Sequence, residues 1–343
     1  MGDRLKGKVA VVTGSGQGIG RAIAIQLGKE GAKVVTNNRK PKSTDVTNLV
    51  GYRLDSLNKE RQEKLNKSLD ELGGDAESTA KTIKDNGGEA VPFYGDVANF
   101  EIAGKLIQTA IGNWGKIDIL VNNAGTFRYA NIWNMSEEIW DTVTGNKPKS
   151  YFNTIRHATP YMMKQKWGRI INCTSGAWLG GAGQNSNYCA ANGGVVSLTY
   201  AVAKELVDYG ITCNSFAPSA LTRATVTILA RFEKMAENGG PKNEDRVQMF
   251  ESHVPPEHLA PFIAYLATDE AKDISGTVFR VSGELIGIYS APQIIREINK
   301  EKGMWTVDEL VKVVPEKLLK GYKNQLFQLY HISARHLSRI CLS

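Results

Sequence analysis

The feature that most limits how this chain can fold is a glycine-rich turn between an apolar run and a helical pattern. Residues 8–13 are rich in valine and lead into Thr13-Gly14-Ser15-Gly16-Gln17-Gly18-Ile19-Gly20. The next residues carry apolar side chains at helical spacing, and this pattern closes at Gly31. Glycines in such a turn let the backbone approach a pyrophosphate, and the helix N-terminus offers N–H groups to it. The segment therefore predicts a dinucleotide site, with a merely structural turn as the alternative.

Strand and helix signals continue to alternate along the chain. Further strands are predicted at 33–37, 90–94, 117–122, 169–173, 212–216 and 278–281, with helical segments between most of them. Strand, helix and strand in repetition predict a parallel sheet covered by helices on both faces. The expected fold class is α/β, a doubly wound parallel sheet, and no internal repeat is visible.

Two regions exceed a minimal version of this plan. We expect one domain over 1–284, with a polar insertion at about 43–74 that contains an exposed helix near 57–72. Residues 285–343 are expected to be a helical extension and tail, with helices at 292–302 and 306–320. Thr306 is followed by acidic residues, as in an N-cap and first turn. A frayed end is expected for the basic segment 331–343, with an intersubunit contact as the alternative.

Composition indicates an ordinary globular protein. The chain is 42% hydrophobic and 22% charged, and its formal charge of +7 is mild for 343 residues. Basic and acidic residues alternate, so nucleic-acid binding is not expected. The four cysteines are widely spaced, which indicates neither a disulfide framework nor a zinc site, and no metal is expected. The N-terminus lacks an apolar signal region and no stretch has membrane-spanning length, so the expected location is cytoplasmic.

Ser175 and Tyr188, thirteen positions apart, form the candidate catalytic pair. A tyrosine hydroxyl has a pKa of about 10, so at neutral pH it is a poor base unless a cation stabilises its phenolate. A lysine would be expected four residues after the tyrosine, and this chain has Asn192 there. The missing lysine therefore decides whether the chain is an enzyme.

Several motifs together resemble the short-chain dehydrogenase/reductase family. They are the glycine turn, Gly95-Asp96-Val97, the run Asp118 to Gly125, and the Ser175/Tyr188 pair. The resemblance extends from about Leu5 to Gly283. It implies a Rossmann-type sheet, a nicotinamide cofactor, and a homodimer or homotetramer formed through the helices beside the active site. The cofactor-binding residues that it implies are Gly14, Ser15, Gln17, Gly18, Ile19, Asn38, Arg39, Asp96, Val97, Asn123, Ala124, Gly125, Asn192, Pro218 and Thr222.

Cofactor choice depends on Asn38 and Arg39, at the end of the second predicted strand. NAD sites commonly have a carboxylate there, which bonds the ribose 2′-hydroxyl and would repel a 2′-phosphate. Asn38 removes that repulsion, and Arg39 could pair with the phosphate. NADP(H) is therefore favoured over NAD(H). The alternative is that Arg39 merely solvates the start of the insertion.

The resemblance implies that Tyr188 exchanges a proton with the substrate oxygen while Ser175 bonds the same oxygen. The family completes this site with a lysine and an asparagine. The spacing from Trp140 to Phe152 places Lys147 at the asparagine position, so the two residue types are exchanged between Lys147 and Asn192. An ammonium from Lys147 could then stabilise the Tyr188 phenolate while Asn192 holds the ribose.

Three alternatives to this exchange stay open. The register could slip by one residue, leaving Asn146 as the asparagine, since Pro148 makes the local backbone uncertain. The site could be active but weakened, or the chain could be an inactive nucleotide-binding or scaffolding subunit.

Signals for the substrate are few. Ser219-Ala220-Leu221-Thr222-Arg223 resembles the variant found in hydroxyacyl-thioester dehydrogenases of the family. The segment 224–255 is then the expected substrate lid, and it carries apolar residues and cations (Phe232, Met235, Met249 and Phe250; Arg231, Lys234 and Arg246). Such a lid suits a hydrophobic carbonyl or alcohol, including an anionic or CoA-linked one, although these residues could simply pack the lid. The expected function is an NAD(P)-dependent oxidoreductase acting on a carbonyl or secondary alcohol.

Overall fold

The structure is a computed structural model that describes residues 2–41, 59, 63, 67, 69–70, 72–181, 183–228 and 254–322. The chain divides into two compact units, Met1–Tyr289 and Ser290–Ser343. Within the described ranges, no helix is both long and apolar enough to span a membrane.

The first unit is built on one eight-stranded sheet with the order β3-β2-β1-β4-β5-β6-β7-β8. The strands from β1 to β7 pair in parallel, whereas β8 pairs antiparallel with β7. The strands are β1 Val9–Val12, β2 Lys33–Asn38, β3 Ala90–Tyr94, β4 Ile119–Asn122, β5 Gly168–Cys173, β6 Ile211–Pro218, β7 Val278–Ser282 and β8 Leu285–Ile288. The predicted α/β class and its seven parallel strands are confirmed. The edge strand β8 was not predicted; Gly283, with a φ of 55°, makes the tight turn that leads into it.

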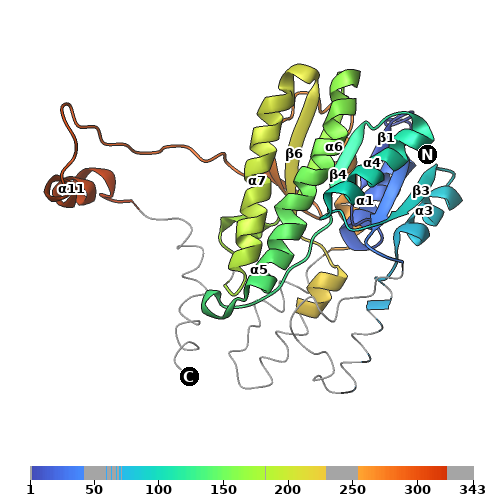
Figure 1. Cartoon of the computed structure of the whole chain (residues 1–343), viewed down its shortest axis with the longest axis horizontal. Helices are drawn as coiled ribbons and strands as arrows, with labels where there is room; N and C mark the ends of the chain where they lie inside the picture. The colour runs from blue at the N-terminus through green and yellow to red at the C-terminus, as the bar shows by residue number, and fades with distance from the viewer. Residues whose placement is uncertain are drawn as a thin grey trace. The chain divides into compact units, whose positions relative to one another are not determined.

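Helices cover both faces of this sheet, as Figure 1 shows for α4, α6 and α7 on one face. The helices are α1 Gly18–Lys29, α3 Ala76–Asp85, α4 Phe100–Trp114, α5 Glu137–Thr144, α6 Ser150–Gln165, α7 Ser186–Leu206, α10 Ala260–Leu266 and, in the second unit, α11 Val307–Val313. Val9 and Val11 belong to the core on the side of α4, α6 and α7, while Ala10 and Val12 belong to the core on the side of α1 and α10. The alternation of side chains along each strand thus supplies two separate cores.

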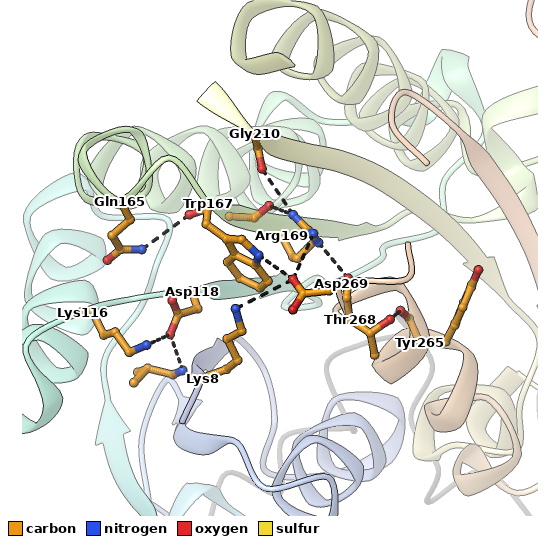
Figure 2. A network of polar contacts seen from close by, with 12 residues as sticks. Lys8, Lys116, Asp118, Gln165, Trp167, Arg169, Gly210, Tyr265, Thr268 and Asp269 are labelled. Atoms are coloured by element: carbon orange, nitrogen blue, oxygen red, sulfur yellow. Dashed lines mark hydrogen bonds and ion pairs between the residues drawn. The ribbon is translucent and has the colours of Figure 1, made fainter. Parts of the chain in front are cut away.

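A polar network joins the amino ends of the central strands (Figure 2). The Trp167 ring lies 3.4 Å from Lys8 Nζ and 4.3 Å from the guanidinium carbon of Arg169, which is 2% exposed. Trp167 also donates a hydrogen bond of 2.8 Å to Asp269. Asp118 accepts one of 2.7 Å from the Val9 amide. These contacts stabilise the edge of the sheet that lies opposite the carboxyl ends of the strands.

The polar insertion predicted at about 43–74 is described only in part. Most of the 43–74 insertion and of its predicted helix lies outside the described residues. The described end of this region leads into α3, which opens with a capping box between Asp75 and Ser78.

In the second unit the predicted helix at 292–302 is wrong, because no helix forms at 290–300. Ile294 and Ile295 remain 83% and 65% exposed, and a short helix that buries no apolar face is marginal in water. The predicted helix at 306–320 forms as α11 followed by a π-helical turn, η7 Val314–Leu318. Its predicted N-cap is confirmed, since the Thr306 side chain accepts from the Glu309 amide.

Candidate functional site

A pocket opens at the carboxyl ends of β1, β2 and β4, where the strand order reverses and ligands bind in this type of sheet. Its lining includes most of the residues predicted for the cofactor, namely Gly14, Gln17, Gly18, Ile19, Asn38, Arg39, Asp96, Val97, Asn123, Ala124, Gly125 and Thr222. It also includes residues that the sequence did not single out for this role, Asn37, Gly95, Thr126, Phe127, Arg223 and Ala224. The turn, three strand ends and the segment after β6 therefore converge on one cavity.

Three predicted cofactor residues do not line this pocket. Ser15 is fully buried, and its hydroxyl donates to the Val12 carbonyl at 2.8 Å while accepting from the Asn37 amide at 2.8 Å. Pro218 ends β6 and pairs with Val281 of β7. Asn192 lies buried in α7. The role of Ser15 is thus to hold the glycine turn against β2.

The glycine turn requires glycine for steric reasons. Gly14 has a φ of 61°, and a Cβ there would lie 2.8 Å from the Ala124 Cα. A Cβ on Gly20 would collide with the Gly14 carbonyl oxygen. Helix α1 begins at Gly18 without a side-chain cap and without an acidic residue in its first turn. Its first N–H groups and its positive dipole end therefore suit an anion such as a phosphate.

Arg223 adds a cation beside this helix terminus, and sequence reasoning missed it as a site residue. Its Nη1 donates a hydrogen bond of 3.2 Å to Gln17 Oε1, although the two residues are 206 positions apart. The side chain is largely buried; burial lowers the pKa of Arg223 below its usual range, while Asp70 raises it. A guanidinium stays charged at neutral pH. The only sequence signal was its place at the end of the 219–223 motif.

At the far end of the pocket, Asn38 is the last residue of β2, where it pairs with Tyr94 of β3, and Arg39 follows it. The Asn38 side chain turns toward the glycine loop, so that a Cβ on Gly16 would collide with it. Among the described residues, the buried Asn38 Oδ1 accepts no hydrogen bond. Arg39 is exposed at the pocket rim. An unsatisfied acceptor beside an exposed cation fits a ribose that carries hydroxyl and phosphate groups.

The structure brings Ser175, Tyr188 and Asn192 together at the ends of β5 and α7. Ser175 caps the short helix η4 Gly176–Leu179, and its Oγ accepts from the Ala177 amide at 3.3 Å. Burial and, to a smaller extent, the nearby Cys173 raise the pKa of Tyr188 to about 12, although side-chain contacts with Ser175 and Asn192 act to lower it. Tyr188 is therefore a neutral hydroxyl at pH 7, and its proton is available for donation.

Asn192 is held by two backbone contacts. Its Nδ2 donates to the Tyr188 carbonyl at 2.8 Å, and its own carbonyl accepts from the Thr174 hydroxyl at 3.1 Å. In the described part of the chain its buried Oδ1 accepts no hydrogen bond of standard geometry. This oxygen can accept a hydrogen bond from a ligand hydroxyl.

Lys147 enters the same region from a π-helical turn, η3 Gly145–Lys149, between α5 and α6. Its backbone is extended there (φ −151°, ψ 133°), which turns the side chain inward, and only 4% of the residue is exposed. The Nζ donates to the Cys173 carbonyl oxygen at 2.8 Å, which also accepts from the Tyr151 hydroxyl at 2.9 Å. A Cβ on Gly125 would lie 2.5 Å from Lys147 Cε. The ammonium thus lies between the pocket wall and the strand end that leads to Ser175.

Asn146, the alternative at this position, lines the pocket, and its Nδ2 donates to the Thr142 carbonyl at 2.7 Å. Lys147 is the member of the pair that contacts β5. Burial lowers the pKa of Lys147, and the Cys173 thiol raises it. The pKa of Tyr188 is shifted by burial, Cys173, Ser175, Asn192 and Cys189. The contact made by Lys147 is therefore with the backbone two residues before Ser175.

Aromatic side chains lie beside Tyr188 and in the short helix that follows Ser175. Phe127 makes edge contacts with Tyr188 and Tyr129, with ring centres 6.2 and 5.6 Å apart. In the helix η4 after Ser175, Trp178 makes an edge contact with Tyr289, with ring centres 5.6 Å apart. The Trp178 Nε1 is buried and finds no acceptor among the described residues. The predicted lid residues between Arg231 and Phe250 lie outside the described part of the chain.

Comparison with known proteins gives consistent results. The family model described as enoyl-(acyl carrier protein) reductase matches residues 62–283, and the one described as short chain dehydrogenase matches residues 8–50. The hydroxyacyl-CoA dehydrogenase ChsB1 of Mycobacterium tuberculosis is 31% identical over 314 residues, which cover 89% of this chain and 87% of that protein. The 3-oxoacyl-acyl-carrier-protein reductase FabG of Staphylococcus epidermidis is 32% identical and covers 80% and 98%, respectively. A crystal structure of a short chain dehydrogenase from Mycobacterium avium matches with a TM-score of 0.70 and 34% identity, over 92% of this chain and 96% of that one.

Proposed function

The chain belongs to the short-chain dehydrogenase/reductase family of oxidoreductases, and from this premise we propose that it reduces a carbonyl group, or oxidises the corresponding alcohol, with NADP(H) as cofactor and Tyr188 as the general acid and base. The observation that carries the proposal is the joint position of Ser175 and Tyr188 beside the pocket, with the side chains of Ser175 and Asn192 acting on the pKa of Tyr188.

The residues present fit a nicotinamide dinucleotide. The glycine turn, the uncapped start of α1 and Arg223 suit the pyrophosphate, and the unsatisfied Asn38 Oδ1 suits a ribose hydroxyl. The neutral Asn38 together with the exposed Arg39 supports NADP(H) over NAD(H). When bound, the cofactor supplies or accepts the hydride.

The protein side of the reaction is proton transfer and positioning. Ser175 Oγ accepts from the Ala177 amide, so its own proton is left to donate to the substrate oxygen. The neutral Tyr188 hydroxyl donates its proton to the same oxygen during reduction and takes it back during oxidation.

In this proposal Asn192 and Lys147 together replace the family's lysine. Asn192 offers its unsatisfied Oδ1 to the nicotinamide ribose. Lys147 is a positioning residue, because it holds the end of β5, and with it the start of the segment that carries Ser175, through the Cys173 carbonyl.

Substrate class follows from the relatives and from the aromatic surroundings. The relatives ChsB1 and FabG are named for hydroxyacyl-CoA and 3-oxoacyl-acyl-carrier-protein substrates, respectively. We extend this to a CoA- or carrier-linked 3-oxoacyl or hydroxyacyl substrate with an apolar acyl group, which Phe127, Tyr129 and Trp178 would contact.

The helices beside the site are the proposed surface for a homodimer or homotetramer. Phe152 of α6 is 49% exposed and stacks on Phe100, also exposed, with ring centres 6.3 Å apart. Phe152 and Leu198 of α7 border a shallow apolar hollow.

The test is a spectrophotometric screen of NADPH oxidation and NADP⁺ reduction with acyl-CoA, carrier-linked, carbonyl and alcohol compounds. Tyr188→Phe should lower turnover by about 10²- to 10⁴-fold and leave NADPH binding intact. Tyr200→Phe, elsewhere on α7, is the matched control and should retain full activity. Turnover by Tyr188→Phe at the wild-type rate would contradict the assigned role.

A second candidate is a nucleotide-binding subunit without turnover. One observation favours it: no lysine is among the groups that lower the pKa of Tyr188. Measurable NADPH binding without turnover of any compound in the screen would support this alternative.

A further inference from the structure

Lys147 carries a buried charge without a compensating carboxylate. Only 4% of the Lys147 surface is exposed. No Asp or Glu of the described residues forms an ion pair with its Nζ. Its polar neighbours are the Cys173 carbonyl at 2.8 Å and the face of the Tyr151 ring, whose centre is 5.5 Å away. Both are dipolar groups, so the positive charge of the ammonium acts on whatever binds nearby.

The charge lies at the reacting end of the pocket. The Lys147 stem packs behind Gly125, which lines the pocket, and its Nζ contacts the strand end that leads to Ser175. A nicotinamide ring that exchanges hydride with a substrate held by Ser175 and Tyr188 has to occupy this end. The oxidised ring carries one positive charge and the reduced ring carries none. Only the oxidised form is therefore repelled by Lys147.

We infer that Lys147 makes the pocket discriminate between the two redox states of the cofactor, so that the reduced form binds more tightly. The inference rests on the proposed function and deepens it by adding a direction. When both forms are present, tighter binding of the reduced form leaves more of the protein loaded for reduction and less of it loaded for oxidation. The neutral Tyr188 hydroxyl agrees with this direction, because reduction needs a proton donor in place at the start.

The size of the effect follows from Coulomb's law. Two unit charges roughly 10 Å apart in a partly buried site change a dissociation constant by about tenfold. The ratio of the dissociation constants for NADP⁺ and NADPH isolates the repulsion between Lys147 and the oxidised ring, because both forms share the same adenosine and phosphate contacts.

The experiment measures that ratio by titration calorimetry for the wild type, Lys147→Met and Lys147→Gln. The matched control is Lys149→Met, which removes an exposed charge two residues away on the same turn. We expect the ratio to fall about tenfold in both Lys147 variants and to stay unchanged in the control. The NAD⁺ and NADH pair should show the same change.

The outcomes separate this inference from the proposed function. An unchanged ratio in a Lys147 variant that binds both cofactor forms would overturn the inference and leave the proposed reaction standing. A fall in the ratio in the absence of any turnover would support the inference and count against catalysis. If neither cofactor form binds the wild type, both are overturned. Because either of the two variants gives the ratio, misfolding of one leaves the other to decide.

Discussion

Lys147 Nζ donates a hydrogen bond of 2.8 Å to the carbonyl oxygen of Cys173, and this contact attaches a buried charge to the strand end that leads to Ser175. The next residue, Thr174, donates its hydroxyl to the carbonyl of Asn192. The two positions at which this chain departs from the family pattern are therefore joined through consecutive residues of one strand end.

Replacing Lys147 by methionine should stabilise the protein. A buried ammonium without a carboxylate partner is costly, and Tyr151 would still satisfy the Cys173 carbonyl. We expect the free energy of unfolding to rise by about 1–4 kcal/mol, as measured by urea denaturation. Lys149→Met, at an exposed site, should stay within about 0.5 kcal/mol of wild type. A loss of stability in Lys147→Met would show that the charge is compensated.

Tyr188 should make stability fall at high pH. Its pKa of about 12 in the folded protein exceeds the ordinary value of 10, so the folded state retains the proton longer than the unfolded state. This contribution is fully present below pH 10 and is lost as the pH rises through 12. Relative to Tyr188→Phe, the wild type should lose about 3 kcal/mol over that range. Urea denaturation at pH 9 and at pH 11 checks the first half of this loss, about 1.4 kcal/mol, with the exposed Tyr209→Phe as control. An equal change in the free energy of unfolding for wild type and Tyr188→Phe would contradict the prediction.

Arg223→Gln should weaken the binding of NADPH and NADH alike. The guanidinium lies beside the start of α1 and contacts Gln17, where both cofactors carry the same pyrophosphate. Loss of one charge-assisted contact should raise both dissociation constants by about 10- to 100-fold. The exposed Arg280 of β7, changed to Gln, is the control. Unaltered affinities in Arg223→Gln would remove this residue from the site.

Asn38→Asp should lower the affinity of the pocket for NADPH. A carboxylate there would repel a 2′-phosphate but bond a 2′-hydroxyl, so NADPH affinity should fall by about 10- to 100-fold while NADH affinity is kept or improved. Asn38→Ser separates the effect of charge from the loss of the amide. Equal losses for both cofactors would show that Asn38 does not face the 2′ position.

Prediction from the sequence worked best where a feature depends on near neighbours. The valine run, the glycine turn and the apolar spacing of α1 are local patterns, and the structure confirms the elements that they predict. The helix expected at 292–302 does not form although its apolar spacing suits one, and among the described residues Ile294 and Ile295 stay largely exposed. The edge strand β8 was missed because its partner, β7, decides its existence.

The candidate site also combines residues that local sequence patterns identify with a contact that they do not. The positions of Ser175 and Tyr188, and the spacing that singled out Lys147, are readable from the chain. The contact between Arg223 and Gln17 spans 206 positions, and no local pattern reports it.

The sequence by itself determined the seven parallel strands, the glycine-rich turn and the types of side chain present at positions 147, 175, 188 and 192. Only the tertiary structure decided that Lys147 contacts Cys173 and that the half-buried Tyr188 has its pKa raised to about 12. The physical reason is that local structure follows from neighbouring residues, whereas burial and charge contacts depend on which distant segments pack together.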